Sequence, residues 1–313
     1  MTGRRHILVV AHARRDDTVE AASRVIDALR GAGAVPVLAP DDRAELIELL
    51  PACADIPALG VDVPLADIEL AIVLGGDGTI LRAAELVRGG TAPVLGINLG
   101  HVGFLAESER DDMDAAVARV IDRDYRVEER LALSVRVKDA HGDVLYETWA
   151  LNEATVEKAS RERMLEVVIE VDSRPLSSFG CDGVVVSTPT GSTAYNFSAG
   201  GPVIWPTVEA IAVVPLSAHA LFAKPLVVGP EAAIAIELLT RTDGTGILWC
   251  DGRRSHDLPP GARVVVRRAE EPVRLARLHP PAFTDRLVRK FRLPVSGWRG
   301  PAQLSPGSGG EPS

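Results

Sequence analysis

Apolar positions in the first 125 residues form short continuous runs that alternate with stretches of helical periodicity. The runs are residues 6–10, 34–38, 71–74 and 93–97, and helical spacing occupies residues 19–29, 44–50, 80–85 and 113–121. Short apolar runs separated by amphipathic stretches predict parallel strands joined by right-handed helical crossovers. We therefore expect the N-terminal part to be an α/β domain with a parallel, Rossmann-like sheet.

The pattern changes near residue 127, where alternation with a period of two replaces helical spacing. Strands are predicted at residues 131–137, 144–149, 164–171, 183–187, 211–215, 233–239, 246–249 and 263–267. We expect residues 1–126 to form the α/β domain and residues 127–280 a mostly β domain. A final helical segment within residues 281–300 is expected to pack back on the first domain. Residues 301–313, rich in Pro, Gly and Ser, are expected to be disordered.

Composition narrows the classes of function. A chain of 313 residues, 46% of them hydrophobic, can bury the cores of two domains. The formal net charge of −9 argues against broad nucleic-acid binding and favours a small-molecule partner. Cys53, Cys181 and Cys250 lack metal-ligand spacing, so we expect free thiols in a reducing cytoplasm. No segment has the pattern of a signal peptide or a transmembrane helix, and no membrane association is expected.

The most informative local motif is Gly75-Gly76-Asp77-Gly78-Thr79, between the third apolar run and the next helix. A strand, a glycine turn and a helix start expose backbone N–H groups that attract phosphate. A carboxylate is unexpected in such an anion site, unless Asp77 serves as a metal ligand or as a base for an incoming hydroxyl. The alternative is a plain glycine turn in which Asp77 caps the helix.

Two further polar segments follow predicted strands. Residues 98–104, Asn-Leu-Gly-His-Val-Gly-Phe, form a second glycine loop after the next apolar run. Carboxyl ends of parallel strands meet at one edge of a sheet, so the two glycine loops should frame a cleft. Asn152-Glu153 ends the run at residues 148–151, and an amide beside a carboxylate suits ribose hydroxyls. A solvated loop explains this pair equally well.

The longest pattern runs from Asp182 to Pro202 and combines a strand, a Ser/Thr-rich loop, a helix start and a glycine turn. Hydroxyls beside free N–H groups can bind phosphate or a base edge, and Tyr195 offers a surface for stacking. The alternative is a hydroxyl-rich turn that packs two strands. His219 has no His or Cys partner at ligand spacing, which leaves a core or interface role beside ligand contact. Signatures of P-loop NTPases, nucleophile-elbow hydrolases and Rossmann dehydrogenases are absent.

Together these segments resemble the NAD kinases, and the resemblance extends from about residue 7 to residue 300. Diacylglycerol kinases, sphingosine kinases and phosphofructokinases carry similar glycine-aspartate loops. The segment Ser-Thr-Pro-Thr-Gly-Ser-Thr-Ala-Tyr at residues 187–195 is what resembles NAD kinases specifically. The end of the chain, residues 284–300, is similar to actinobacterial members.

The resemblance implies phosphorylation of the 2′-hydroxyl of the adenosine ribose of NAD, giving NADP, with ATP or polyphosphate as donor and Mg²⁺ as the divalent metal. Asp77 would be the base, and Gly75, Gly76, Gly78 and Thr79 would face the donor's phosphates. The metal would be held largely by phosphates and water, and no side chain is assigned to it. The implied NAD contacts are Gly78, Phe104, Asn152, Glu153, Asp182, Thr190, Thr193, Ala194, Tyr195 and Ser198.

The resemblance also implies a homodimer or homotetramer, because in the family Asp182 can come from a neighbouring subunit. Gly180 stands where NAD-selective relatives often have arginine, so we hypothesise that NADH is accepted as well. Arg253 replaces a common glutamine and leaves the role of Asp251 open, with charge pairing in the oligomer as one interpretation. A lipid or sugar kinase of the same superfamily and a non-catalytic dinucleotide sensor remain as alternatives.

Overall fold

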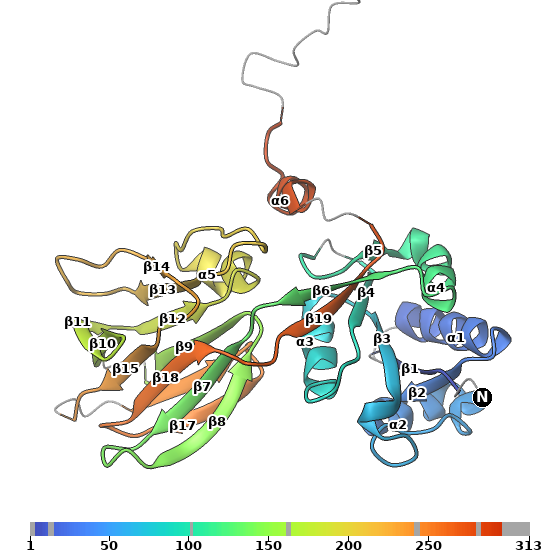
Figure 1. Ribbon diagram of the computed structural model, residues 1–313, viewed down its shortest axis with the longest axis horizontal. Helices are drawn as coiled ribbons and strands as arrows, with labels where there is room; N and C mark the ends of the chain where they lie inside the picture. Colours follow the sequence, from blue (N-terminus) through green and yellow to red (C-terminus); the bar gives the residue numbers. More distant parts are fainter. Residues whose placement is uncertain are drawn as a thin grey trace, which may run out of the picture.

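The structure, a computed structural model, describes residues 4–11, 16–100, 103–160, 164–240, 245–279 and 283–295. It consists of an α/β domain and a mostly antiparallel β domain that lie side by side (Figure 1). This confirms the predicted fold class. The expected disorder of residues 301–313 concerns a segment outside the described residues.

The first domain is built on one sheet in the order β2-β1-β3-β4-β19-β6, with β5 beside β4. Its strands are β1 (His6–Ala11), β2 (Val35–Leu38), β3 (Ile68–Leu74), β4 (Val94–Asn98), β5 (Ser108–Glu109), β6 (Arg126–Arg130) and β19 (Val273–Arg277). Its helices are α1 (Asp16–Gly31), α2 (Pro40–Leu49), α3 (Asp77–Leu86) and α4 (Met113–Ile121), with short 3₁₀ turns at Pro51–Cys53, Leu65–Asp67 and Arg110–Asp112. Strands β1 to β4 pair in parallel, as the helical crossovers predict.

Alternate side chains of these parallel strands enter two separate buried clusters. Ile7 and Val9 of β1 pack in one cluster with apolar residues of α1 and α4. Leu8 and Val10 belong to another cluster, which contains the apolar face of α3. Because strand side chains alternate between faces, the sheet is covered by helices on both sides and its strands are apolar throughout.

The second domain contains two six-stranded antiparallel sheets, in the orders β11-β10-β15-β18-β7-β8 and β14-β13-β12-β9-β16-β17. The first comprises β7 (Leu133–Lys138), β8 (Val144–Ala150), β10 (Leu165–Val171), β11 (Arg174–Cys181), β15 (Ile234–Leu238) and β18 (Arg263–Arg268). The second comprises β9 (Glu153–Lys158), β12 (Gly183–Ser187), β13 (Ile211–Leu216), β14 (Leu226–Val228), β16 (Gly246–Cys250) and β17 (Arg254–Leu258). Apolar residues of both sheets share one buried cluster, as in a β-sandwich.

The chain passes between the domains twice, at positions that differ from the expected boundaries at residues 126/127 and 280/281. Strand β6 precedes the second domain and β19 follows it, yet both extend the first sheet. They pair antiparallel with each other, and β19 lies parallel to β4. Strand β19 covers the start of β4 at Val94, and β5 pairs with its end at Ile97 and Asn98, so the edge of β4 is not left open. Figure 1 shows both strands as the two links between the domains.

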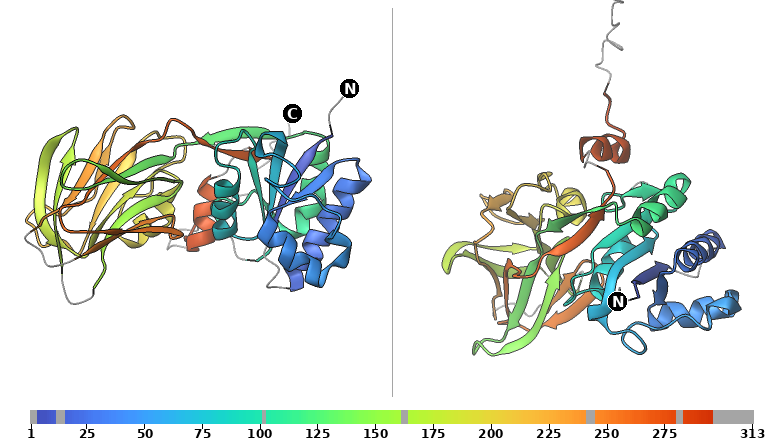
Figure 2. Two further views of the ribbon diagram at one scale, coloured as in Figure 1. Left: turned by 90° about the horizontal axis from the view of Figure 1, so that it is seen from below. Right: turned by 45° about the vertical axis from the view of Figure 1, so that its right-hand side comes forward.

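Helix α6 (Phe283–Phe291) contacts both domains rather than the first domain alone. Its Arg286 donates to the carbonyl oxygen of Phe104 at 2.6 Å and to the Glu107 carboxylate at 3.0 Å. The helix also contacts the second domain, where the ring of Phe291 stacks on the ring of Phe197 with centroids 4.3 Å apart. The helix stands above the junction of the domains in Figure 1 and in the right-hand view of Figure 2.

Two smaller expectations concern cysteines and membranes. Cys53, Cys181 and Cys250 are free and buried, and burial raises the pKa of the Cys181 and Cys250 thiols to about 12. The prediction of free thiols is therefore confirmed. Within the described ranges, no helix combines the length and apolar character that a membrane crossing requires.

Candidate active site

The first glycine loop joins β3 to α3 and leaves the start of the helix open. Gly76 is the residue before the first helical turn, and no side chain caps that turn among the described residues. Gly76 and Gly78 are exposed, and the backbone N–H groups of Thr79 and Ile80 bond back to the carbonyl oxygen of Gly76. The first N–H groups of a helix have no partner within it, and the helix dipole is positive there. The loop can therefore accept a phosphate through its backbone.

Asp77 fastens the second glycine loop to the first. One carboxylate oxygen accepts the backbone N–H of Phe104 at 2.9 Å, and the other accepts that of Leu105 at 3.0 Å. Gly103 lies so close that a Cβ there would overlap the Asp77 carboxylate. The two predicted loops thus meet at Asp77. Each of its oxygens keeps acceptor capacity for a further partner.

Asn152 and Glu153 lie where β8 passes into β9, and Asp251 holds this turn. The Asp251 carboxylate accepts backbone N–H groups from Leu151 at 2.9 Å and from Asn152 at 2.7 Å, with a longer contact to Glu153 at 3.4 Å. It also pairs with Arg254 at 2.8 Å, and its side chain is 1% exposed. The proposed charge pairing of Asp251 across an oligomer is therefore wrong, because its charge is enclosed within this chain.

Glu153 is a buried carboxyl with an unused oxygen. The residue is 7% exposed, and its Oε2 has no hydrogen-bond partner among the described residues. Burial, reinforced by the negative charge of Asp251, raises the pKa of Glu153 to about 8, although a backbone N–H from Tyr195 opposes the shift. A buried polar oxygen without a partner is costly, so a ligand hydroxyl that forms a hydrogen bond with it is favourable. The solvated-loop interpretation of this pair is wrong.

The hydroxyl-rich segment folds over the same turn. Thr188 donates its hydroxyl to the carbonyl oxygen of Leu151 at 2.6 Å and accepts the backbone N–H of Gly191 at 3.1 Å. A Cβ at Gly191 would overlap the backbone of Asn152, so only glycine allows this approach. Ser192 is also satisfied within the fold, by the carbonyl oxygen of Pro189 at 2.7 Å. Part of the segment thus has the structural role given by the alternative interpretation.

Thr190 and Thr193 instead line a cavity of about 210 Å³ at the junction of the domains. Phe104 lines it too, so three of the predicted NAD contacts meet there. The remaining lining residues are Leu105, Glu128, Arg130, Trp205, Pro206, Thr207, Arg277, Phe283, Thr284 and Arg286. The cavity is therefore enclosed by both domains and by α6.

The three arginines of this cavity were not identified from the sequence. Arg277 pairs with Glu107 at 3.0 Å and with Glu128 at 2.5 Å, and the side chains of Arg277 and Glu107 are 4% and 2% exposed. Burial, with the nearby charge of Arg277, lowers the pKa of Arg130 to about 10. Arg130 and Arg277 lie on β6 and β19, for which no strand was predicted, and Arg286 lies on α6. The sequence carries no clear signal for them, because residues 126–130 (Arg-Val-Glu-Glu-Arg) and 273–277 (Val-Arg-Leu-Ala-Arg) do not alternate with a period of two.

Of the other predicted contacts, Tyr195 and Ser198 lie on a short helix, α5 (Tyr195–Ser198), and Ala194 joins this helix to a preceding 3₁₀ turn at Gly191–Thr193. The backbone N–H of Tyr195 bonds to the Glu153 carboxyl, and its hydroxyl bonds to Glu157. Ala194 is half-buried, while Tyr195 and Ser198 are exposed. Tyr195 therefore links the helix to the Glu153 turn.

Asp182 and Gly180 lie apart from this cavity, around the link between β11 and β12. Asp182 pairs with Lys158 at 2.5 Å, which lowers the pKa of the Asp182 carboxyl, and its side chain is 40% exposed. Gly180 accepts the backbone N–H of His219 at 2.9 Å. His219 itself is exposed, so its interpretation as a core residue is wrong. The second glycine loop also contains His101, which lies outside the described residues.

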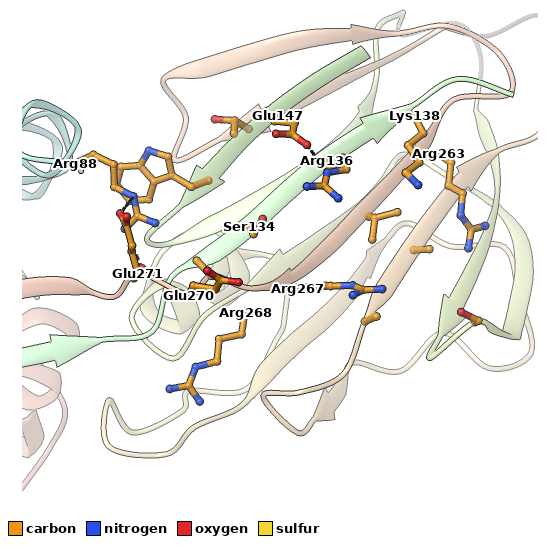
Figure 3. A pocket seen from close by; sticks show the side chains of 17 residues that line it. Arg88, Ser134, Arg136, Lys138, Glu147, Arg263, Arg267, Arg268, Glu270 and Glu271 are labelled. Atoms are coloured by element: carbon orange, nitrogen blue, oxygen red, sulfur yellow. Dashed lines mark hydrogen bonds and ion pairs between the residues drawn. The ribbon is translucent and has the colours of Figure 1, made fainter. Parts of the chain in front are cut away.

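A larger hollow of about 840 Å³ lies on the outer face of the sheet that contains β7, β15 and β18 (Figure 3). None of the predicted site residues lines it. Arg136 and Arg263 in this hollow already pair with Glu147 and Glu170, at 2.5 Å in each case. The hollow is thus a surface of mostly compensated charges, separate from the residues described above.

The described part of the chain contains no group of three or more His, Cys, Asp or Glu side chains arranged to hold a metal ion. Asp77 is the carboxylate of the glycine loops, and its free acceptor capacity fits one position in the coordination shell of a hard cation. A magnesium ion bound mainly by ligand phosphates and water is compatible with this donor set.

Comparison with known proteins identifies the family to which the chain belongs. The family models of the ATP-NAD kinase N-terminal and C-terminal domains match residues 7–125 and 151–278. The chain is 67% identical over 301 residues to an NAD kinase of Leifsonia xyli subsp. xyli, covering 96% of this chain and 99% of the relative. It is 56% identical over 299 residues to NAD kinase 2 of Streptomyces coelicolor, covering 95% and 97%.

Two solved structures have a similar fold. The yeast NADH kinase complexed with NADH superposes with a TM-score of 0.82 over 95% of this chain and 90% of that one, at 24% identity. An NAD kinase from Archaeoglobus fulgidus in complex with ATP gives a TM-score of 0.69 over 93% and 99%, at 26% identity. With the matches over nearly the whole sequence and the two glycine loops joined at Asp77, the chain belongs to the NAD kinase family.

Proposed function

We propose that this protein transfers a phosphoryl group from ATP to the 2′-hydroxyl of the adenosine ribose of NAD, forming NADP. The main support for this proposal is the position of Asp77. Its carboxylate stands at the open N-terminus of α3 and holds the backbone of Phe104, which lines the cavity between the domains. One side of the carboxylate is suited to phosphates and the other to a bound nucleoside. The names of the close relatives favour this function over a lipid or sugar kinase or a non-catalytic sensor.

The acceptor side of the site is formed by Asn152 and Glu153 together with the residues that line the cavity. The unpartnered Oε2 of Glu153 can form a hydrogen bond with a ribose hydroxyl, and Asn152 supplies an amide. Phe104, Thr190 and Thr193 offer apolar and hydroxyl contacts for the adenosine. We further assign Ala194, Tyr195 and Ser198 to the NAD site, since α5 is joined to Glu153 through Tyr195.

The donor side is the glycine loop at residues 75–79. Gly76 and Gly78 are exposed residues, and their backbone N–H groups would bind the terminal phosphates, with Thr79 in the first helical turn. Mg²⁺, when bound with the donor, would neutralise charge on the transferring group. A backbone cradle does not distinguish ATP from polyphosphate, so polyphosphate is a second donor to compare in the same assay.

In the reaction, the 2′-oxygen forms a bond to the γ-phosphorus while the bond to the β,γ-bridging oxygen breaks and ADP leaves. The hydroxyl proton passes to a carboxylate oxygen of Asp77. A secondary hydroxyl is a poor nucleophile at neutral pH, so a positioned base lowers the barrier. Two backbone N–H groups fix the orientation of the Asp77 carboxylate, which fits this role.

Asp77→Asn tests the assignment with purified protein and a coupled assay for NADP. We expect kcat to fall by about 10²-fold or more, as for a lost general base, while NAD binding measured by calorimetry is largely retained. Asp41→Asn is the matched control, because Asp41 is an exposed aspartate in the first turn of α2. Undiminished turnover by Asp77→Asn would refute the role of Asp77. Absence of NADP formation by the wild type would refute the function.

We also propose that NADH is accepted as a substrate. A Cβ at Gly180 would lie 3.4 Å from Cε of Met164, which is an ordinary contact, and the backbone there has no positive φ. Glycine is therefore not required by the fold at this position. We expect Gly180→Arg to fold normally and to lower kcat/KM for NADH more than for NAD. Equal losses with the two dinucleotides would contradict the proposal.

Asp182 is proposed to complete the NAD site of a neighbouring subunit in a homodimer or homotetramer. Its side chain is 40% exposed and lies apart from the cavity of its own chain. Mixing Asp182→Ala with Asp77→Asn subunits tests this, since a hybrid oligomer contains one site that lacks neither residue. Recovery of activity on mixing is the expected result, and two inactive proteins that stay inactive would contradict it.

A further inference from the structure

Helix α3 joins the two domains, in addition to carrying Asp77 at its first position. The buried cluster on its side of the sheet includes Ile80 and Ala84 of the helix and extends to Ala132 and Leu151 of the second domain. The N-terminal end of α3 therefore faces the proposed donor, while its apolar face belongs to a core shared with the acceptor side. The placement of α3 relative to the second domain decides where Asp77 lies relative to the acceptor.

Ion pairs connect the last turn of α3 to the second domain. Glu85 pairs with Arg253 at 3.2 Å and with Arg254 at 3.0 Å. The side chains of Glu85 and Arg254 are 24% and 20% exposed, so this contact is only partly screened by solvent. Arg88, which follows the helix and is labelled in Figure 3, adds a contact of 4.6 Å from its guanidinium carbon to the ring centroid of Trp149.

Arg254 connects this contact to the turn that carries the acceptor residues. Its guanidinium pairs with the buried Asp251 carboxylate at 2.8 Å and also lies 4.6 Å from the ring centroid of Trp149. Asp251 in turn accepts the backbone N–H groups of Leu151 and Asn152. A continuous series of contacts therefore leads from the last turn of α3 to the backbone of Asn152.

We propose that Glu85 and Arg254 are positioning residues that set the distance and direction between Asp77 and the Asn152-Glu153 turn. This inference rests on the proposed function. The planar guanidinium of Arg254 donates Nη2 to Asp251 at 2.8 Å, and its Nε lies 3.0 Å from a Glu85 oxygen as an ion pair without hydrogen-bond geometry, so one rigid group holds the two carboxylates near each other. Asp77 and Glu85 are eight residues apart, about 12 Å along a rigid helix, so a tilt at one end displaces the other. Displacements of about 1 Å at a reacting group can cost about 10²-fold in rate.

The adjacent Arg253 is the natural comparison. Its Nε donates to both oxygens of the Glu85 carboxylate, at 3.3 and 3.2 Å, and its side chain is 35% exposed. Among the described residues, the Arg253 guanidinium forms no ion pair with Asp251. Removal of Arg253 should thus weaken one surface ion pair and leave the connection from α3 to Asn152 intact. Removal of Glu85 breaks that connection and keeps Asp251 paired with Arg254.

The test uses the full-length protein with Glu85→Ala, Arg254→Lys, the double variant and Arg253→Ala as control. Alanine is a good helix former, so α3 should persist without Glu85. The amine of a lysine at position 254 cannot reproduce the two-sided contact of the guanidinium. We expect Glu85→Ala and Arg254→Lys each to lower kcat by about tenfold or more, with KM for ATP and calorimetric Kd for NAD within about threefold of wild type. Arg253→Ala should stay within about twofold in kcat.

The double variant should be no slower than the slower single variant, because both substitutions break one connection. The inference is overturned if Glu85→Ala keeps wild-type kcat, if Arg253→Ala loses as much as Glu85→Ala, or if the two losses multiply. Should Arg254→Lys not fold, Glu85→Ala against Arg253→Ala still decides the question. A wild type that forms no NADP would refute the proposed function instead, so the two failures are distinguishable.

Discussion

Replacement of Glu153 by glutamine tests the electrostatics of the acceptor side. The Glu153 residue is 7% exposed, and burial together with the charge of Asp251 raises its pKa from an ordinary 4.5 to about 8. Since this pKa is higher in the folded chain, the folded state holds the proton more tightly than the unfolded state does. The resulting contribution to stability is complete below pH 4.5 and is lost as the pH rises to about 8. It amounts to on the order of 5 kcal/mol across that window.

The assay is urea unfolding followed by circular dichroism over this pH range, for wild type and Glu153→Gln. We expect the wild-type free energy of unfolding, relative to that of the variant, to fall continuously across the window, because glutamine does not titrate. Glu170→Gln is the control with the opposite sign. Hydrogen bonding to Arg263 lowers the pKa of Glu170, so its contribution is lost only as the pH falls below the ordinary value. Parallel stability curves for wild type and Glu153→Gln would refute the assignment of a raised pKa.

Two further predictions concern the residues around the cavity. Gly103→Ala should lower kcat by about tenfold or more, because its Cβ would overlap the Asp77 carboxylate and displace an oriented group, whereas Gly100→Ala has open space and should stay near wild type in the same assay. Glu107→Gln should destabilise the protein by about 3 kcal/mol or more in thermal unfolding, because Glu107 is 2% exposed and pairs with two arginines. Glu209, whose exposed carboxylate pairs with Arg268, provides the control. An equal loss of stability in Glu209→Gln would contradict this reasoning.

The parts of the fold that the sequence predicts well are those with one strong periodicity. Strands such as β3 and β12 are buried along almost their whole length, so their apolar runs are unmistakable. Strands β6 and β17 lie at sheet edges and are mostly exposed or half-exposed, and their charged composition hides them. Strand β19 pairs with residues about 145 positions earlier, a relation that local pattern does not contain. This is why the domain boundaries were misplaced by one strand each.

The candidate site likewise contains residues that local sequence patterns predict and residues that they do not. Motif residues such as Asp77 and Asn152 were found because turns and helix starts have local signatures. The bond from Phe104 to Asp77 followed the expectation that two loops on neighbouring parallel strands meet. The burial of Glu153 and its contact with Asp251, about 100 residues away, depend on how the β domain closes. Arg277 was not predicted either, because its role depends on contacts between distant parts of the sequence. Its partners Glu107 and Glu128 come from other strands and loops of the first domain.

The remaining question about Asp77 is whether its bonds to the second glycine loop are its whole role. A purely structural carboxylate would be replaceable at the chemical step once the loop is held, and Gly103→Ala would then match Asp77→Asn in every kinetic property. A base gives a different result. Gly103→Ala displaces the carboxylate but leaves a proton acceptor in the site, whereas asparagine keeps the size of the side chain and offers no comparable acceptor. A larger loss of kcat in Asp77→Asn than in Gly103→Ala, at similar affinity for NAD, is therefore the result that a base requires. The two N–H bonds then serve the chemistry by fixing the carboxylate in one orientation.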